Sequence, residues 1–248
     1  MKKDLTWLKE ALIAHRGLHT EDGTIPENSL LAFQQALQMG YAIELDVNVL
    51  KDGTVVSFHD IHLKRLCGDD RMLSELTFSD IKSLKLLSSD ERIPTLDDVL
   101  NMVDGRVPLL IELKPHGDVV KLCAHVMKSL QHYQGTYAIF SFHPRVVYWF
   151  KRHHPHVIRG QIAESFKSNP KMHPIAKWMM KHMIFNRFTQ PDFISYGIHD
   201  LPNPILDRYK KKNMIIISYA ARSQSEFDHV KSSYDNVVFE FFIPKQKG

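Results

Sequence analysis

The stretch AIELDV, residues 42–47, is an apolar run that carries two carboxylates. Seven further apolar runs of similar length occur in the chain, and stretches with helical spacing lie between them. Strands that alternate with crossover helices form a parallel sheet, and eight such strands are the number in a (β/α)8 (TIM) barrel of the α/β class. The expected strands cover residues 11–15, 42–47, 108–114, 137–142, 157–163, 192–198, 214–220 and 236–241.

The composition predicts one globular domain over residues 1–248. Hydrophobic residues make up 44% and charged residues 24%, which excludes disorder, collagen and coiled coil. No Gly/Ser linker or low-complexity tract marks a second domain. Two cysteines, Cys67 and Cys123, are too few for a disulfide framework and are predicted to be free thiols. With no signal-peptide core and no apolar run of about 18 residues, we expect a cytoplasmic protein.

The strand at 42–47 is expected to continue into a β-hairpin. An Asp-Gly pair at 52–53 between apolar residues is a strong hairpin signal. If Leu50 faces Val55, His59 lies directly across from Asp46, on the same face of the hairpin. The sequence therefore predicts a hairpin extension of the second strand.

A small insertion is expected at 61–107, before the third barrel strand. Two helical patterns lie there, where one crossover needs only one helix. The pairs Thr77 with Asp80 and Thr95 with Asp98 both match the capping box that starts a helix. The insertion follows the second strand and should lie near the barrel mouth.

Acidic residues recur on two expected strands. Glu44 and Asp46 are two residues apart, so both side chains leave one face of an extended chain, and Glu112 lies on the next parallel strand. Buried carboxylates repel one another unless a cation lies between them, so we favour a metal site over outward carboxylates at a solvated strand end. Three oxygen donors without a cysteine cluster favour Mg²⁺ or Ca²⁺ over zinc.

Basic residues follow the same strand ends. His15 and Arg16 end the first strand, and Lys114 ends the third, at the barrel edge where active sites form. Arginine suits bidentate capture of phosphate oxygens, and Lys114 could neutralise an anion or form a surface pair with Glu112. His59 is predicted to transfer protons, the alternative being a structural histidine bonded to the backbone.

Taken together, these motifs resemble the glycerophosphodiester phosphodiesterase family. The resemblance is specific over residues 13–115 and weakens afterwards to Ser141-Phe142 and Ile194-Ser195-Tyr196. The motifs that carry it are His15-Arg16-Gly17, Pro26-Glu27-Asn28-Ser29, Glu44-Leu45-Asp46-Val47, Lys51-Asp52-Gly53, His59-Asp60, Ile93-Pro94-Thr95-Leu96 and Glu112-Leu113-Lys114.

The resemblance implies a role for each motif. It implies a barrel with a small insertion that binds one divalent cation, Mg²⁺ or Ca²⁺. The metal ligands would be Glu44, Asp46 and Glu112, the acid and base His15 and His59, and the phosphate ligands Arg16 and Lys114. Further candidate pocket residues are Glu27, Asn28, Tyr196, Tyr219 and Phe241.

The far half of the chain departs from the family pattern. Many relatives have Trp-Thr-Val-Asn on the penultimate strand, where this chain has Ser218-Tyr219-Ala220-Ala221. The last strand also differs, with Phe239-Glu240-Phe241-Phe242-Ile243-Pro244 in place of Ile-Thr-Asp-x-Pro. The departures concern the alcohol pocket rather than the phosphodiester chemistry.

The implied function is metal-dependent hydrolysis of a small glycerophosphodiester to glycerol 3-phosphate and an alcohol. Two alternatives are a lysophospholipase D-like hydrolase and a catalytically silent barrel that binds phosphodiesters or a partner. The silent barrel is disfavoured because no member of the carboxylate and histidine set is missing. No nucleic-acid module is recognisable, and the sequence does not determine an oligomeric state.

One segment combines basic and apolar residues. Residues 171–188 carry Trp178, four methionines and two phenylalanines among lysines, a pattern that a membrane-surface helix also has. We favour a crossover helix whose apolar side packs on the barrel, because the topology needs a helix there.

Overall fold

The computed structural model describes residues 3–167, 170 and 172–245. Its strands follow the order β1-β9-β8-β7-β6-β5-β4-β2-β3, and β1 also pairs with β2. This cyclic order of eight strands, with helices between them along the chain, confirms the (β/α)8 barrel, and β3 is the additional hairpin strand. The bounds are β1 (Ile13–Ala14), β2 (Ala42–Val49), β3 (Val55–Ser57), β4 (Leu109–Leu113), β5 (Tyr137–Ser141), β6 (Ile158–Ala163), β7 (Phe193–Gly197), β8 (Ile215–Ala221) and β9 (Asn236–Phe239).

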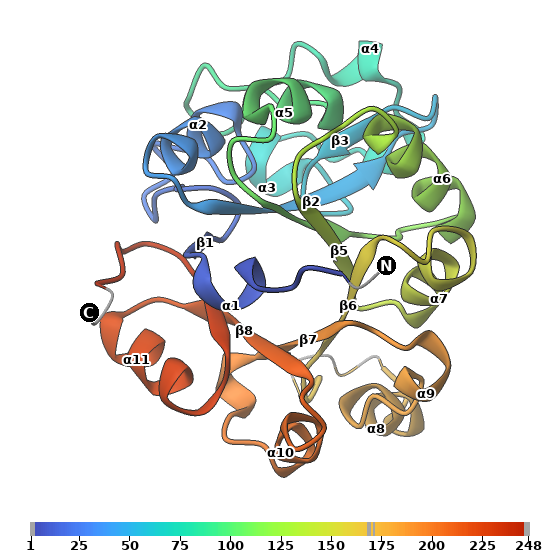
Figure 1. Ribbon diagram of the computed structural model, residues 1–248. Helices are drawn as coiled ribbons and strands as arrows, with labels where there is room; N and C mark the ends of the chain where they lie inside the picture. Colours follow the sequence, from blue (N-terminus) through green and yellow to red (C-terminus); the bar gives the residue numbers. More distant parts are fainter. Residues whose placement is uncertain (1–2, 168–169, 171, 246–248) are drawn as a thin grey trace. The chain divides into compact units, whose positions relative to one another are not determined.

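Helix α1 precedes β1, and the other helices fall between the strands (Figure 1). The first six are α1 (Trp7–Glu10), α2 (Leu30–Gln38), α3 (Lys64–Cys67), α4 (Phe78–Ile81), α5 (Leu96–Val103) and α6 (Val119–Leu130). Those that follow are α7 (Pro144–His153), α8 (Pro174–Lys181), α9 (Asn186–Thr189), α10 (Pro204–Lys210) and α11 (Gln224–Ser233). Two short 3-10 turns are η1 (Leu73–Glu75) and η2 (Ile198–Asp200).

Internal contacts divide the chain into two compact units. Unit 1 comprises Met1–Leu12 and Ile139–Gly248, and unit 2 comprises Ile13–Ala138. The organisation of residues 1–248 as a single domain stays a prediction.

Unit 2 is built on parallel strands. Strand β2 pairs with β1 and with β4, and in the second pair Asp46 is the Cα partner of Glu112. Helices α2 and α5 pack against each other, and α2 also covers β2 (Figure 1). The side chain of Ser29 caps α2 by accepting a hydrogen bond from the Ala32 amide, a contact typically worth about 1 kcal/mol.

The predicted hairpin forms, but its register differs by one residue from the expectation. Val49, not Leu50, is the partner of Val55. Phe58 therefore lies opposite Asp46 at the end of the ladder. Its amide donates to the Asp46 carbonyl at 3.0 Å. The prediction that His59 lies directly across from Asp46 is wrong.

The turn explains this register. Gly53 has φ +92°, a backbone conformation that L-residues rarely adopt, and a Cβ there would lie 2.4 Å from the ring of His125. The Leu50 amide donates to the Thr54 carbonyl, which leaves a turn of residues 51–53. A short turn with glycine in the left-handed region closes the hairpin one residue earlier than a longer loop would.

The predicted insertion lies between β3 and β4 and holds α3, η1 and α4, while α5 serves as the crossover helix. Both predicted capping boxes are present, at Thr77 and at Thr95. The insertion shares a hydrophobic cluster with the hairpin. The buried members of that cluster are Leu50, Val56, Phe58, Leu63, Leu66, Leu73, Leu76, Ile81, Leu86 and Ile93.

Unit 1 contains the parallel strands β6 to β9. Its helix α8 fits the expectation for 171–188 only in part. Ala176, Met179 and Met180 are half-buried and Met183 is buried, so one apolar side does pack within the unit. Ile175 and Trp178, in contrast, are 62% and 56% exposed. Lys171, the first residue of that expected segment, lies outside the described residues.

Two further findings concern the cysteines and the lengths of the helices. Cys67 and Cys123 are both free thiols, as predicted. Within the described ranges, every helix is too short or too polar to span a bilayer.

Candidate active site

Three carboxylates converge in unit 2. Asp46 and Glu112 are register partners on β2 and β4, and Glu44 lies two residues before Asp46, on the same face of β2. One oxygen from each of the three lies within 4.8 Å of the other two. The residues are 1 to 7% exposed, so they are charged groups in the interior. Parallel register therefore brings the three predicted metal ligands together.

Asn28 holds Asp46 from the α2 side. Its Nδ2 donates to Asp46 Oδ2 at 2.9 Å, and its Oδ1 accepts from the Asp46 amide at 3.1 Å. The same Oδ1 accepts from the Ser57 hydroxyl at 3.0 Å. Asn28 is 1% exposed and has φ +57°. It therefore orients a carboxylate rather than lining an open pocket.

Lys114 follows β4 and lies against two of the carboxylates. Its Nζ is 2.7 Å from Glu112 Oε1 and 3.3 Å from Asp46 Oδ1. Burial alone would lower the pKa of Lys114, but the two carboxylates raise it to about 12. The side chain therefore stays cationic at neutral pH.

The turn after β1 positions His15 and Arg16. Arg16 has φ +51°, and its backbone amide donates to Glu44 Oε2 at 3.0 Å. Gly17 follows at φ +78°, and a Cβ there would lie 2.7 Å from the Ala32 backbone. The His-Arg-Gly motif thus packs directly on α2, which requires glycine at its third position.

The guanidinium of Arg16 bridges two acidic groups. Its Nη1 donates to Glu27 Oε1 at 2.6 Å, and its Nε lies 3.1 Å from Asp46 Oδ2. Burial alone would lower the pKa of Arg16, but Asp46, Glu27 and Glu44 together raise it above its usual range. Arg16 thus provides a permanent positive charge next to the carboxylate cluster.

The two predicted acid–base histidines both lie in unit 2. His15 Nε2 is 3.9 Å from Glu44 Oε2. His59 Nδ1 is 2.7 Å from Asp60 Oδ1, a contact that fixes one side of its ring. The charge of His59 also acts on Asp46, lowering the pKa of that carboxyl. His59 is therefore near the cluster, although the hairpin ladder ends at Ser57 and does not align it with Asp46.

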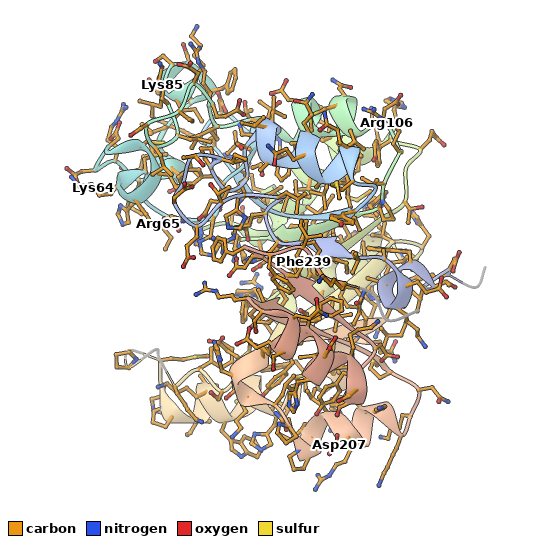
Figure 2. The ribbon with its side chains drawn as sticks, turned by 90° about the vertical axis from the view of Figure 1, so that its left-hand side faces the viewer. Lys64, Arg65, Lys85, Arg106, Asp207 and Phe239 are labelled. Atoms are coloured by element: carbon orange, nitrogen blue, oxygen red, sulfur yellow. The ribbon has the colours of Figure 1, made fainter. Side chains whose placement is uncertain are left out.

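Arg65 extends this network from the insertion. It forms two hydrogen bonds with Asp60, at 2.7 and 3.1 Å, and two with Glu27, at 2.7 and 2.8 Å. Asp60 in turn contacts His59, and Glu27 contacts Arg16. Figure 2 shows Arg65 next to Lys64, at the edge of unit 2 that the insertion forms. One arginine thus connects the acidic partner of His59 with the acidic partner of Arg16.

The carboxylates differ in how readily they ionise. Burial raises the pKa of Glu44 well above its usual value, and the neighbouring Asp46 and Glu112 raise it further. Burial also raises the pKa of Glu112, against the opposing charge of Lys114. In Asp46 burial acts the same way, but Lys114 and Arg16 hold its pKa well below the usual range.

The donor set fits a hard divalent cation. Three buried carboxylates have oxygens within 4.8 Å of one another, and Lys114 and Arg16 offset their charge only in part, because the pKa of Glu44 stays raised by its burial and by Asp46 and Glu112. A divalent cation between them would remove this repulsion. All three candidate ligands are carboxylates, which Mg²⁺ and Ca²⁺ prefer. The residues present therefore fit the predicted metal site.

A cavity of about 240 Å³ lies beside Lys114 in unit 2. Its lining includes Asn48, Ile61, Leu73, Lys114, His116 and Lys121. A larger cavity of about 610 Å³ lies in unit 1 and has none of the candidate site residues in its lining. Of these two cavities, the smaller one is lined by a candidate site residue, Lys114.

The other candidate pocket residues lie in unit 1. Tyr196 is fully buried, and its hydroxyl donates to the Lys181 carbonyl at 3.3 Å. The Tyr219 hydroxyl donates to the Ala163 carbonyl at 3.3 Å. Phe241 has φ +67°, and the Arg222 guanidinium lies 5.3 Å from its ring centre. Their role in a substrate pocket stays a prediction.

Sequence reasoning does not assign a role to Asp60 or Arg65. Asp60 follows His59 directly, and an acid beside a predicted catalytic histidine is a signal for an orienting partner. Arg65 lies on the four-residue helix α3, which is too short for a periodic pattern. Its contact with Glu27 joins residues 38 positions apart, which no local signal indicates.

Comparisons with known proteins concern the family and the fold of the chain. Residues 15–235 match the model of the glycerophosphoryl diester phosphodiesterase family. The YhdW protein of Bacillus subtilis is 33% identical over 155 residues, which cover 59% of this chain and 63% of that protein. A glycerophosphodiester phosphodiesterase of Bacillus altitudinis is 27% identical over 174 residues, 65% of this chain and 70% of that enzyme. The match thus spans less than two thirds of YhdW.

A solved structure shares the fold. It is that of an Oleispira antarctica phosphodiesterase in complex with the product sn-glycerol-3-phosphate. The two folds superpose with a TM-score of 0.79 at 22% identity, and the match covers 94% of both chains. The barrel is therefore common to both proteins over nearly their whole length.

Proposed function

The chain belongs to the glycerophosphoryl diester phosphodiesterase family, and on that premise we propose that it hydrolyses glycerophosphodiesters to glycerol 3-phosphate and an alcohol. The observation that carries this proposal is the buried cluster of Glu44, Asp46 and Glu112, with Arg16 and Lys114 against it. Carboxylates for a cation and cations for a phosphate thus lie within one site, as phosphodiester hydrolysis requires.

One divalent cation, Mg²⁺ or Ca²⁺, would be held by Glu44, Asp46 and Glu112. Such an ion supplies Lewis-acid stabilisation of the charge that grows on phosphoryl oxygens. The repulsion among three buried carboxylates, which helps to raise the pKa of Glu44, supports this assignment. The donor set is compatible with either ion.

Arg16 and Lys114 would bind the phosphate. The raised pKa of each keeps it charged at every pH at which the enzyme is expected to work. Both cations lie against carboxylates, so they are fixed in position before substrate binds. Preorganised positive charge stabilises the transition state without reorganisation at the moment of reaction.

His15 and His59 would move the protons. Hydrolysis adds water across the phosphodiester, breaks the bond between phosphorus and the alcohol oxygen, and leaves a proton on that oxygen. One histidine accepts the proton of the glycerol 2-hydroxyl as that oxygen attacks phosphorus, and the other donates a proton to the departing alcohol; water then opens the resulting cyclic phosphate to glycerol 3-phosphate. Asp60 would hold the ring of His59 through Nδ1, leaving Nε2 for substrate.

We further propose that the protein acts in the cytoplasm on a small-molecule substrate. Two free thiols, one of them buried, fit a reducing compartment. The product complex of the Oleispira phosphodiesterase supports a small glycerophosphodiester as substrate.

The decisive test is a hydrolysis assay on metal-stripped protein. Mg²⁺ and Ca²⁺ are added back separately over glycerophosphocholine, glycerophosphoethanolamine and lysophosphatidylcholine, and glycerol 3-phosphate and released alcohol are measured. We expect one ion to restore turnover on the two soluble diesters. Turnover confined to lysophosphatidylcholine would instead indicate a lysophospholipase D.

Histidine variants test the proton transfers. His15→Ala and His59→Ala should each lower turnover by about a hundredfold or more, the usual scale of acid–base catalysis. His229→Ala, which changes an exposed histidine of α11, is the matched control and should retain full turnover. If either site variant matches the control, that histidine does not take part in catalysis.

A further inference from the structure

Helix α8 presents an apolar face that nothing in its unit covers. None of its residues is buried, and Ile175 and Trp178 are more than half exposed. They are three residues apart, so at 3.6 residues per turn they lie on the same face. Phe188, on α9, is 55% exposed as well. Three of the nine large hydrophobic side chains that are exposed among the described residues thus fall within residues 175–188.

The flank of this face is basic. Lys177 and Lys181 are four residues apart, so they form a stripe on one side of Ile175 and Trp178. Neither lysine forms an ion pair with any residue that the structure describes. The chain contains no aspartate or glutamate over residues 165–191, where it has five lysines and arginines.

The other side of α8 holds it in place within unit 1. The Lys181 carbonyl accepts from the hydroxyl of the buried Tyr196, and the chain continues into the buried Met183. On the exposed side, the ring of His182 stacks on Trp178 at 4.8 Å between ring centres. Figure 1 places α8 beside α9 at the periphery of unit 1. The helix therefore displays a fixed surface rather than a loose segment.

We propose that α8 docks the protein onto the surface of an anionic lipid bilayer. Trp178 and Ile175 would enter the interface between headgroups and acyl chains, the position that tryptophan favours in membranes. Lys177 and Lys181 would lie along it, with their ammonium groups on the lipid phosphates. This inference does not rest on the proposed function, because lipid binding needs no turnover.

Charge separates this occupant from a second copy of the chain. Two α8 faces in contact would bring four lysines together, and residues 165–191 of neither copy supply a carboxylate to neutralise them. Like charges at such a distance repel, whereas an anionic bilayer supplies the opposite charge over its whole surface. The eight-residue helix is only about 12 Å long, so docking should be reversible and depend on anionic lipid.

The test uses the full chain and vesicles of equal parts phosphatidylcholine and phosphatidylglycerol, with pure phosphatidylcholine vesicles for comparison. Co-sedimentation measures the bound fraction against lipid concentration. We expect binding to the anionic vesicles that weakens as salt is raised, because the interaction of lysines with a charged surface is screened. Binding to pure phosphatidylcholine should be at least tenfold weaker.

Two double variants separate the apolar and basic contributions. Ile175→Ser with Trp178→Ser, and Lys177→Glu with Lys181→Glu, should each lower the partition coefficient on the order of tenfold or more. Lys82→Glu with Lys128→Glu changes the net charge equally at exposed positions of unit 2 and should bind as the wild type does. Far-ultraviolet circular dichroism monitors folding and should be the same in all four proteins.

Three results would overturn the proposal. The first is wild-type protein that stays in the supernatant with anionic vesicles while its circular dichroism is that of folded protein. In the second, the control variant loses binding as much as the α8 variants, so that net charge alone accounts for it. The third is a wild-type mass in light scattering that doubles with concentration and returns to the monomer in the α8 variants, which would make this face a self-association surface.

Discussion

Asn28 forms two hydrogen bonds with Asp46: it donates to the carboxylate at 2.9 Å and accepts from the backbone amide at 3.1 Å. One amide side chain thus fixes both the backbone and the side chain of a proposed metal ligand. Outer partners of this kind orient metal ligands, and their loss typically lowers metal affinity or activity 10- to 100-fold.

Asn28→Ala should therefore lower turnover on glycerophosphocholine by about 10- to 100-fold and raise the metal concentration needed for half activation. Metal titration of steady-state rates measures both quantities. Asn101→Ala, at an exposed position of α5, is the control and should behave as the wild type does. An Asn28 variant with unchanged metal dependence would show that Asp46 needs no such support.

Replacing Arg65 should disturb both arms of the site. Arg65→Met frees Asp60 and Glu27 from their shared partner, so His59 loses its fixed orientation, and we expect turnover to fall about tenfold or more with an altered pH–rate profile. Arg71→Met is matched to it, because Arg71 lies in the same insertion but pairs only with Asp69. The idea fails if the two variants have the same pH–rate profile.

Glu44→Gln should abolish turnover and stabilise the metal-free protein. The pKa of Glu44 is raised, so its stabilising contribution is present below about pH 4.5 and is lost as the pH rises through the higher folded value. In metal-free protein at neutral pH, glutamine should therefore raise the free energy of unfolding, because it removes a buried charge, and turnover should be lost. Urea unfolding in chelator from pH 4 to pH 8 checks the trend. A constant difference from wild type across that range would contradict it, and Glu75→Gln serves as the exposed control.

Lys114→Met should destabilise the protein as well as inactivate it. Removing the ammonium leaves the buried Glu112 without its ion-pair partner, a loss of about 3 kcal/mol or more, while Asp46 keeps Arg16. The pKa of Lys114 is raised from 10.5 to about 12, so its contribution is complete below pH 10.5 and disappears as the pH passes 12. Unfolding curves of variant and wild type should thus converge only in strong alkali. Equal stability at pH 8 would rule out the ion pair as a stabilising contact.

Much of the carboxylate cluster is predictable because it follows from repeating geometry. The two-residue spacing of Glu44 and Asp46 fixes their shared face, and parallel pairing brings Glu112 beside them. Side-chain alternation and parallel pairing are properties of any such pair of β-strands and need no knowledge of the loops. The same holds for the eight-strand order, which the alternation of apolar runs and helical stretches indicates.

The position of His59 is not predictable in this way. Hairpin register depends on the number of turn residues, and Gly53 in the left-handed region closes the turn one residue early. The ladder then ends at Ser57, and irregular chain carries His59 to the site. Arg65 escapes prediction for a related reason, because its partner Glu27 is distant in sequence and α3 is too short to show a pattern.

The exposed face of α8 shows a different limit. Ile175 and Trp178 fit the spacing of a packed amphipathic helix, and this spacing alone cannot tell burial against the protein from exposure. The absence of acidic residues over 165–191 is the sequence signal that distinguishes this segment from an ordinary crossover helix.

The hydrophobic cluster shared by the insertion and the hairpin has a consequence for heat inactivation. Segments with a small core of their own can open while the rest of a protein stays folded. Opening here would release Arg65 and the segment that carries His59 together, because Phe58 and Leu66 belong to the same cluster. On warming, turnover should therefore disappear reversibly several degrees before the far-ultraviolet circular dichroism of the barrel changes, and cooling should restore it.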